Sequence, residues 1–339
     1  MIFIIPLFIP FLLLLESILS LNFLLAILVF VLFPIVSKLI GPLCPSDIIV
    51  RGRLNKAVAN ISLCLYPCVS LFAIYYVLIR FLYVDFSVPS SLFVFFSLWL
   101  VASLNLPVLH EMIHRKDVLT KLYCEALLIL FVFPIFKEDH LAHHVREGHD
   151  GSSDYGNVGV SVYRYLLCRP IWVVRDVWHL NRLVLCDIRL VRFFIILRLL
   201  LSCALWIYIV RANGKVAFLW LIIIFLVHLS YGVISYVQHY GLSAVEGDFQ
   251  FSSYSWSHDC LIQAILLYGN SLHHDHHRSK DKNFTELCLY LRSLITPYSY
   301  LYLFFIAFFP RFFDRIMREE LRKYHQSPSG LDGGRHYFC

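Results

Sequence analysis

Residues 216–242 read VAFLWLIIIFLVHLSYGVISYVQHYGL and hold both features that decide the fold of this 339-residue chain. The part from 216 to 238 is almost entirely apolar, and about 20 such residues are enough to cross the hydrocarbon of a bilayer as one helix. The stretch then reaches His239, whose imidazole is poorly tolerated in hydrocarbon and is a common metal ligand. We therefore expect a membrane helix with a candidate metal-binding histidine at its end.

The rest of the chain belongs to the same compositional class. It is 59% hydrophobic and only 15% charged, with a mean hydropathy of +0.70, well above that of a soluble domain. The same length criterion predicts six transmembrane helices. They cover roughly residues 2–19, 21–41, 60–83, 88–109, 192–210 and 216–238. The predicted fold is thus an all-α integral-membrane bundle of six spans.

Two further apolar segments are not counted as transmembrane helices. Segment 122–136 is short and lies between histidine groups, so we expect a re-entrant or interfacial hairpin. Segment 286–309 is interrupted by Arg292 and Pro297, and we expect it to lie against the membrane face. One membrane-embedded domain, 1–325, would then be followed by a flexible tail, 326–339, rich in Ser, Pro and Gly.

Charge predicts the orientation of the bundle. Six crossings place the loop 42–59, the region 110–190 and everything after 239 on one side, and these are the basic parts of a chain with net charge +6. The positive-inside rule assigns that side to the cytoplasm, in a bacterial inner membrane or a eukaryotic endomembrane. No basic tract interleaved with aromatic residues suggests a nucleic-acid partner. The ten cysteines form no Cys-x-x-Cys pair and no disulfide framework.

Histidines recur in four groups, all on this predicted cytoplasmic side. Nine are candidate metal ligands: His110, His114, His140, His143, His144, His239, His273, His276 and His277. Spacings of three and four residues place rings on one face of a helix. One metal ion seldom needs more than six donors, so nine predict two ions with open positions. Mono-iron oxygenases use two histidines and a carboxylate, and soluble di-iron bundles rely on glutamates, so this pattern is richer in histidine than either.

The other histidines have simpler interpretations. His228, within a predicted span, is expected to be an interior residue with a hydrogen-bond partner. His274 should point away from the face that its neighbours share. His149 could be a loop residue or support the site, and the isolated histidines are expected to lie outside it. These are His179, His258, His325 and His336.

Acidic residues accompany the histidine groups. Glu111, Glu138, Asp139 and Asp275 each lie within two residues of a candidate ligand. A ligating imidazole usually donates its other N–H to a carboxylate, which fixes the ring. We expect these four to support the ligands, with Asp275 the strongest candidate; the simpler alternative for each is a solvated loop charge.

The histidine groups and their order resemble the integral-membrane alkane 1-monooxygenases, within the wider superfamily of membrane fatty-acid desaturases and hydroxylases. The pattern His-x-x-x-His, His-x-x-His-His, His-x-x-His-His is common to that superfamily. Ser235-Tyr-Val-Gln-His239-Tyr-Gly-Leu242 resembles the Asn-Tyr-x-Glu-His-Tyr-Gly-Leu box of the alkane branch. The resemblance extends over about residues 100–320, and includes Val162-Tyr-Arg-Tyr-Leu166 and Tyr254-Ser-Trp256.

The resemblance implies two non-haem iron ions held by the nine histidines. It also implies that an alkyl chain from the bilayer reaches them through an apolar channel, and that O2 supplies the oxygen inserted at the terminal carbon. Electrons would come from a separate redox protein such as rubredoxin with its reductase, since no Cys-x-x-Cys pairs exist for a fused one.

The chain departs from the family pattern at three places. The family's second box usually reads Glu-His-x-x-Gly-His-His, whereas Glu138-Asp139-His140-Leu-Ala-His143-His144 has the shorter desaturase spacing. Either His140 or Asp139 could therefore fill the first position of this box. Gln238 replaces the usual glutamate before His239, and His274 replaces a small polar residue.

Three other functions remain open from the sequence. A fatty-acid desaturase or another lipid hydroxylase would use the same site. A haem- or metal-binding membrane transport protein would also need histidines, although haem ligation requires pairs near the membrane middle rather than clusters at helix ends. A catalytically inactive lipid-binding relative is the third alternative, because a shifted ligand could abolish metal binding.

Overall fold

The computed structural model describes residues 2–21, 23–43, 48–84, 87–145, 156–180, 187–242, 255–279, 281–289 and 293–326. Helices make up most of these ranges, as predicted. The expectations for the tail after residue 326, and those for His149, Tyr254 and Arg292, lie outside the described residues, as do those for the side chains of His179 and His325.

Four helices are long and apolar enough to cross a membrane. They are α4 (Arg53–Tyr83), α5 with α6 (Val88–Ser103 and Asn105–Ile113), α10 (Ile188–Ala212) and α11 (Gly214–His239). At 1.5 Å per residue, a 26-residue helix such as α11 is about 39 Å long, more than the roughly 30 Å of bilayer hydrocarbon. The chain is therefore an integral-membrane protein with at least these four candidate spans.

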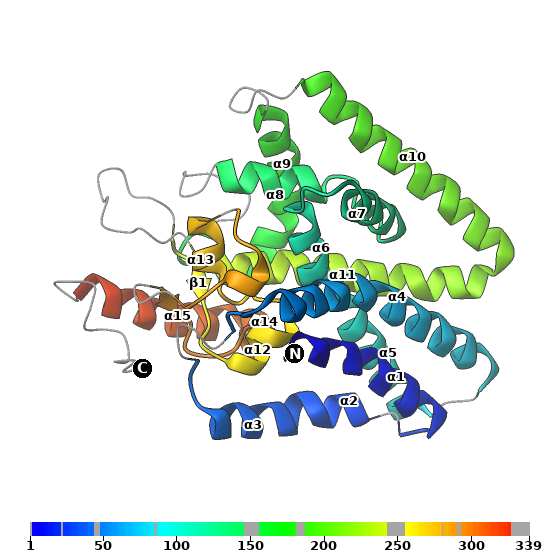
Figure 1. The fold of residues 1–339 in the computed structure, drawn as a ribbon, viewed down its shortest axis with the longest axis horizontal. Coiled ribbons are helices and arrows are strands. Elements are labelled where there is room, and N and C mark those ends of the chain that lie inside the picture. Colours follow the sequence, from blue (N-terminus) through cyan, green and yellow to red (C-terminus); the bar gives the residue numbers. More distant parts are fainter. Residues whose placement is uncertain are drawn as a thin grey trace.

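The first two predicted spans form shorter apolar helices. Residues Ile2–Leu7 and α1 (Phe8–Ile18) make one, and α2 (Leu24–Ile27), a π-helical turn at Leu28–Leu32 and α3 (Phe33–Ile40) make the other. They run beneath α4 and α5 in Figure 1. Glu16, buried in α1, accepts hydrogen bonds from the hydroxyl of Ser97 in α5, which ties the N-terminal helices to the bundle.

The remaining elements gather at one end of the long helices, except for α7, which lies below α10 in Figure 1. They are α7 (Val118–Leu130), α8 (Phe136–Val145), α9 (Val162–Leu180), α12 (Leu261–Leu266), α13 (His273–Arg278), η3 (Phe284–Glu286), α14 (Tyr300–Ala307) and α15 (Pro310–Gln326). In the described part of the apolar segment 286–309, the short strand β2 (Leu294–Ile295) precedes α14, so these residues do not form one continuous helix. This strand pairs in parallel with β1 (Trp256–Ser257), a small addition to the all-α prediction.

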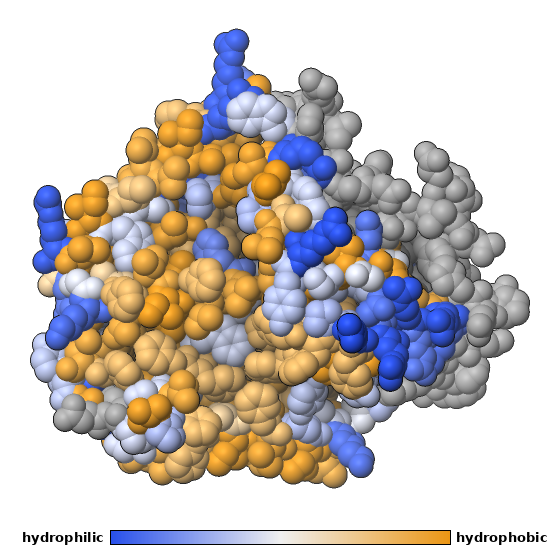
Figure 2. Space-filling view, turned by 180° about the vertical axis from the view of Figure 1, so that it is seen from behind, coloured by the Kyte–Doolittle hydropathy of each residue, from blue (hydrophilic) through white to orange (hydrophobic). Residues whose placement is uncertain are grey.

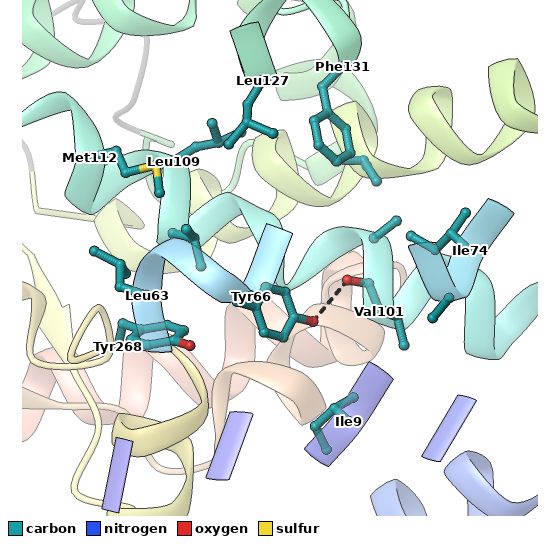
Figure 3. Packing of buried hydrophobic residues seen from close by; sticks show 14 of the residues in the cluster. Ile9, Leu63, Tyr66, Ile74, Val101, Leu109, Met112, Leu127, Phe131 and Tyr268 are labelled. Atoms are coloured by element: carbon teal, nitrogen blue, oxygen red, sulfur yellow. Dashed lines mark hydrogen bonds between the residues drawn. The ribbon is translucent and has the colours of Figure 1, made fainter. Parts of the chain in front are cut away.

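The buried core joins α4, α5, α6 and α7 (Figure 3). Tyr66 of α4 lies fully buried and donates its hydroxyl to the carbonyl of Val101 in α5, at 3.0 Å. Leu109 and Met112 of α6 pack toward Leu127 of α7 in the same view. This packing holds α6, which carries the first histidine pair, against the membrane helices.

The outer surface is largely apolar. Apolar side chains cover most of the face in Figure 2, and the largest hydrophilic group lies at the right of the view, which is the α13–α15 end of Figure 1. Only 11% of the most apolar 18-residue stretch of α10 is buried inside the protein. In water such a face would be unfavourable, so the surface of α10 indicates contact with lipid.

Candidate metal centre

The histidines are presented by four helix segments at the polar end of the bundle. Helix α6 carries His110 and is followed directly by His114, and α11 ends at His239. The break between α5 and α6 has a local cause, because Pro107 has no N–H to donate to the carbonyl of Ser103. Asn105 adds hydrogen bonds at this break by donating its side-chain amide to the carbonyls of Val101 and Ala102.

Helices α8 and α13 supply the other six rings. Their sequences place histidines at spacings of three and four residues, so the rings project from one face of each helix. Together the four segments produce two groups of four histidines, with candidate ligand atoms within 4.8 Å of one another in each group. The first quartet is His110, His114, His140 and His276, and the second quartet is His143, His239, His273 and His277.

His144 lies between the quartets. Its Nε2 is 3.0 Å from that of His140 and 3.1 Å from that of His276, and its ring centroid is 4.7 Å from that of His277. The structure therefore brings together all nine histidines that the sequence singled out. His228 and His274 lie outside both quartets; His228 stacks on Phe133 and contacts the carbonyl of Phe131.

The shifted second box is also explained by the geometry. His140 Nε2 lies 2.6 Å from His114 Nε2, inside the first quartet. Asp139 instead accepts hydrogen bonds from Arg169 at 2.8 Å and from the hydroxyl of Tyr231 at 3.0 Å. Of the two alternatives for the first position, the structure places His140 among the candidate ligands.

The geometry of the rings fits metal ions. Imidazole nitrogens bind an ion such as zinc at about 2.0–2.1 Å, so two donors at right angles around it lie roughly 3 Å apart. The Nε2–Nε2 distances of 2.9 Å for His143–His277 and 3.0 Å for His273–His277 match that spacing.

Hydrogen bonding alone does not account for this convergence. A ring nitrogen carries either one proton or one lone pair in its plane, so His140 Nε2 cannot satisfy both His114 and His144. His110 Nε2 is buried, and none of the described residues offers it a hydrogen-bond partner. Lone pairs that converge in a buried space are stabilised by a cation, and imidazole suits iron, zinc, copper and nickel.

Burial keeps these imidazoles in the form that binds metal. Desolvation, followed by the neighbouring imidazoles, holds the pKa of His140 and of His144 well below the ordinary value of 6.5. The same causes lower the pKa of His273 and His277. The rings are therefore neutral at physiological pH, with lone pairs available for a metal ion.

Buried carboxylates surround the quartets, and each is paired with a cation. The four predicted supporting residues form the pairs Glu111–Arg115 at 3.0 Å, Glu138–Arg198 at 2.5 Å, Asp139–Arg169 at 2.8 Å and Asp275–Lys282 at 2.9 Å. Asp275 also accepts the backbone N–H of Cys288 at 3.0 Å. The pairs of Glu138 and Asp139 connect α8 to α10 and α9, and that of Asp275 connects α13 to the segment after it. Glu111 pairs locally with Arg115 and accepts the backbone N–H of Phe284 at 3.4 Å. These contacts stabilise the positions of the rings.

The basic partners in these pairs were not predicted from the sequence. Arg198 lies in the middle of a predicted span, and an ionisable residue at that depth is a recognised signal of a buried function or pair. Arg169 lies in α9 and carried no comparable signal. The pairing of Arg198 with Glu138 joins residues 60 apart in the chain, which spacing patterns do not reveal.

An apolar cavity of about 200 Å³ ends at the histidines. His110 and His140 of the first quartet line it, as do His143, His239 and His273 of the second. The rest of its wall is predominantly apolar and comes mainly from α1, the π-helical turn, α3, α5, α6, α8, α11, α12 and α14. An apolar molecule in this cavity would therefore face both quartets.

Apolar membrane helices, two adjoining histidine quartets and a cavity that reaches both define the class: an integral-membrane protein with a polyhistidine metal centre. Comparison with known proteins shows which family of such membrane proteins the chain belongs to. The model of the fatty acid desaturase family matches residues 88–292, more than half of the chain and including all nine histidines. The chain belongs to this family.

Individual relatives are similar over a shorter share of their length. Alkane 1-monooxygenases 1 and 2 of Pseudomonas aeruginosa are 25% and 24% identical to the chain over 241 residues, 66% of this chain and 62% and 63% of theirs. Alkane 1-monooxygenase 1 of Alcanivorax borkumensis is 22% identical over 244 residues, 67% of this chain and 59% of its own. The chain thus spans about three fifths of the curated relatives that it matches.

Proposed function

We propose that the protein is a membrane di-iron monooxygenase that hydroxylates the terminal carbon of an alkane or a similar alkyl-chain lipid. The observation that carries this proposal is the apolar cavity that reaches five of the nine clustered histidines, eight of which are buried and one, His114, half-buried. The proposed ligands are these nine, five around the first ion with His144 included and four around the second. When bound, the two iron ions would supply the activation of O2 that side chains cannot perform.

The protein's own part in this reaction follows from the site. The apolar wall would bind the alkyl chain and exclude water, while the neutral imidazoles hold the ions beside the chain end. The carboxylate–cation pairs at Glu111, Glu138, Asp139 and Asp275 would keep the ligand helices in register. Misplacement of reacting groups by 1 Å can cost about 100-fold in rate, so this support matters for activity.

The membrane arrangement is part of the proposal. The helices Ile2–Ile18 and Leu24–Ile40 would complete a bundle of six membrane helices with the four longer ones. The histidine end would face the cytoplasm, where a separate electron donor such as rubredoxin reaches it. Support comes from the basic residues of that end, such as Arg311, Arg315 and Arg322, whose side chains in α15 are exposed.

A desaturase that uses the same centre is the second candidate, and two observations favour it. The family model bears that name, and the second box has the His-x-x-His-His spacing. Product analysis separates the two reactions. The reconstituted protein would be given an alkyl substrate, a reducing system and 18O2. An alcohol with 18O at the terminal carbon supports the proposal, whereas an alkene without 18O would favour the desaturase.

A further inference from the structure

A second hollow of about 570 Å³ lies beside the apolar cavity and has a different chemistry. Its wall is formed by α3, by the segment from His258 to Cys260, and by residues 296–302. Hydroxyl groups are prominent in it, from Ser37, Thr296, Ser299 and the tyrosines 298 and 302. No function assigned above uses this hollow.

The two hollows adjoin. Phe33 of α3 lines both of them. Ser299 lines the polar hollow and the next residue, Tyr300, lines the apolar cavity; Cys260 and Gln263 of one short segment are divided in the same way. The two hollows therefore share part of one wall, with polar and apolar linings on adjacent residues.

The polar hollow is held in shape by hydrogen bonds. The backbone N–H of Leu43 donates to the carbonyl of Asp259 at 2.7 Å, which fastens the segment after α3 to the opposite wall. Thr296 donates its backbone N–H to Ser257 at 2.9 Å. On the inner wall, the buried His258 lies with Nδ1 3.3 Å from the hydroxyl oxygen of Thr296 and 3.7 Å from Asp259 Oδ1.

The charges of the lining are balanced. The lining contains one lysine, the exposed Lys38, and one carboxylate, that of Asp259. Such a lining offers hydrogen-bond donors and acceptors without a net charge that would select an anion or a cation. A neutral group with oxygen atoms fits this chemistry, since polar side chains at a site fix orientation through hydrogen bonds.

We propose that this polar hollow binds the neutral, oxygen-bearing head of an alkyl substrate, such as an ester or a hydroxyl, while the alkyl tail occupies the apolar cavity. This inference rests on the proposed function of the cavity and narrows its substrate class. A plain alkane leaves the hollow without a ligand group. An amphiphile is held at both ends, so its head sets which end of the tail reaches the histidines.

Binding measurements on the iron-loaded full chain in lipid nanodiscs test this inference. The probes are radiolabelled dodecyl acetate, dodecane and dodecyl phosphate, and the measured quantity is the ratio of their dissociation constants. We expect dodecyl acetate to bind at least fivefold more tightly than dodecane. Thr296→Val should reduce this preference about fivefold, because one hydrogen bond contributes about 1 kcal/mol. Ser37→Ala is a second, independent variant, and Thr120→Val on α7 is the matched control.

Each other outcome overturns the inference. Equal binding of dodecyl acetate and dodecane would show that the hollow recognises no head group, as would a preference unchanged in both Thr296→Val and Ser37→Ala. Tighter binding of dodecyl phosphate than of dodecyl acetate would show that the hollow selects an anionic head group instead of a neutral one. Because binding is measured without turnover, a failure here differs from a failure of the proposed function, which would appear as an absence of iron or of oxygenated product.

Discussion

Removal of the Arg198 side chain tests the structure most severely among the single substitutions. The guanidinium is buried in α10 and binds Glu138 through two hydrogen bonds, one of 2.8 Å from Nη1 to Oε2. It also donates to the carbonyl of Pro134 and pairs with Glu125. Arg198→Met keeps an unbranched apolar side chain about as long as the stem of arginine, but removes the guanidinium and leaves Glu138 buried without its cation.

The expected cost follows from that burial. Removing one partner of a buried ion pair destabilises a protein by about 3–5 kcal/mol, because the other charge remains uncompensated. Glu138 lies in α8 two residues before His140, so the same change should displace the helix that carries three candidate ligands. We therefore expect both a lower unfolding temperature and less bound metal.

Three comparisons make this prediction specific. Unfolding temperature and iron per chain are measured in one detergent for the wild type, Arg198→Met, and the double variant Arg198→Met with Glu138→Gln. The double variant should recover part of the stability, since a neutral amide costs less to bury than a carboxylate. Arg211→Met, at the exposed end of the same helix, should change stability by less than about 0.5 kcal/mol. An Arg198→Met protein with the stability and iron content of the wild type would refute the reasoning.

Three other predictions concern the histidine centre and the turn that follows α11. The metal-free protein should lose stability as the pH falls below 6.5. Burial lowers the pKa of His140 and His273 in the folded state, so the unfolded chain takes up protons first. Unfolding curves between pH 8 and 5 measure this loss, and a stability that does not change with pH would contradict it. His144→Ala should reduce bound metal severalfold while His274→Ala should not, and equal effects on metal content would show that the position between the quartets has no special role. Gly241→Ala should destabilise the protein by about 1–2 kcal/mol, since Gly241 has φ +74° in the left-handed region; denaturant titration checks this, and an unchanged midpoint would argue against that backbone conformation.

The local parts of the fold and site could be predicted from the sequence. The spans at α4, α10 and α11 follow from apolar length, which is a property of consecutive residues. The convergence of rings on α8 and α13 follows from spacings of three and four residues, because helix periodicity is fixed by the backbone. The same reasoning predicted that His274 would lie outside the face of its neighbours.

Features that depend on distant residues were not predictable in this way. Two of the four carboxylates have partners in distant segments, Arg198 for Glu138 and Arg169 for Asp139. The β1–β2 pair contains only two residues per strand, too few for a period-2 pattern. The polar hollow joins α3 to residues more than 200 positions later, so nothing in either stretch alone indicates it.

The number of iron ions per chain tests the central claim most directly. The purified wild-type protein and His239→Ala would be analysed by elemental analysis against protein concentration, with His228→Asn as a control outside both quartets. We predict two irons per chain in the wild type and in the control, and a clear loss in His239→Ala, which removes one of the four donors of the second quartet. An absence of iron from the wild type, or iron content unaffected by His239→Ala, would contradict the account.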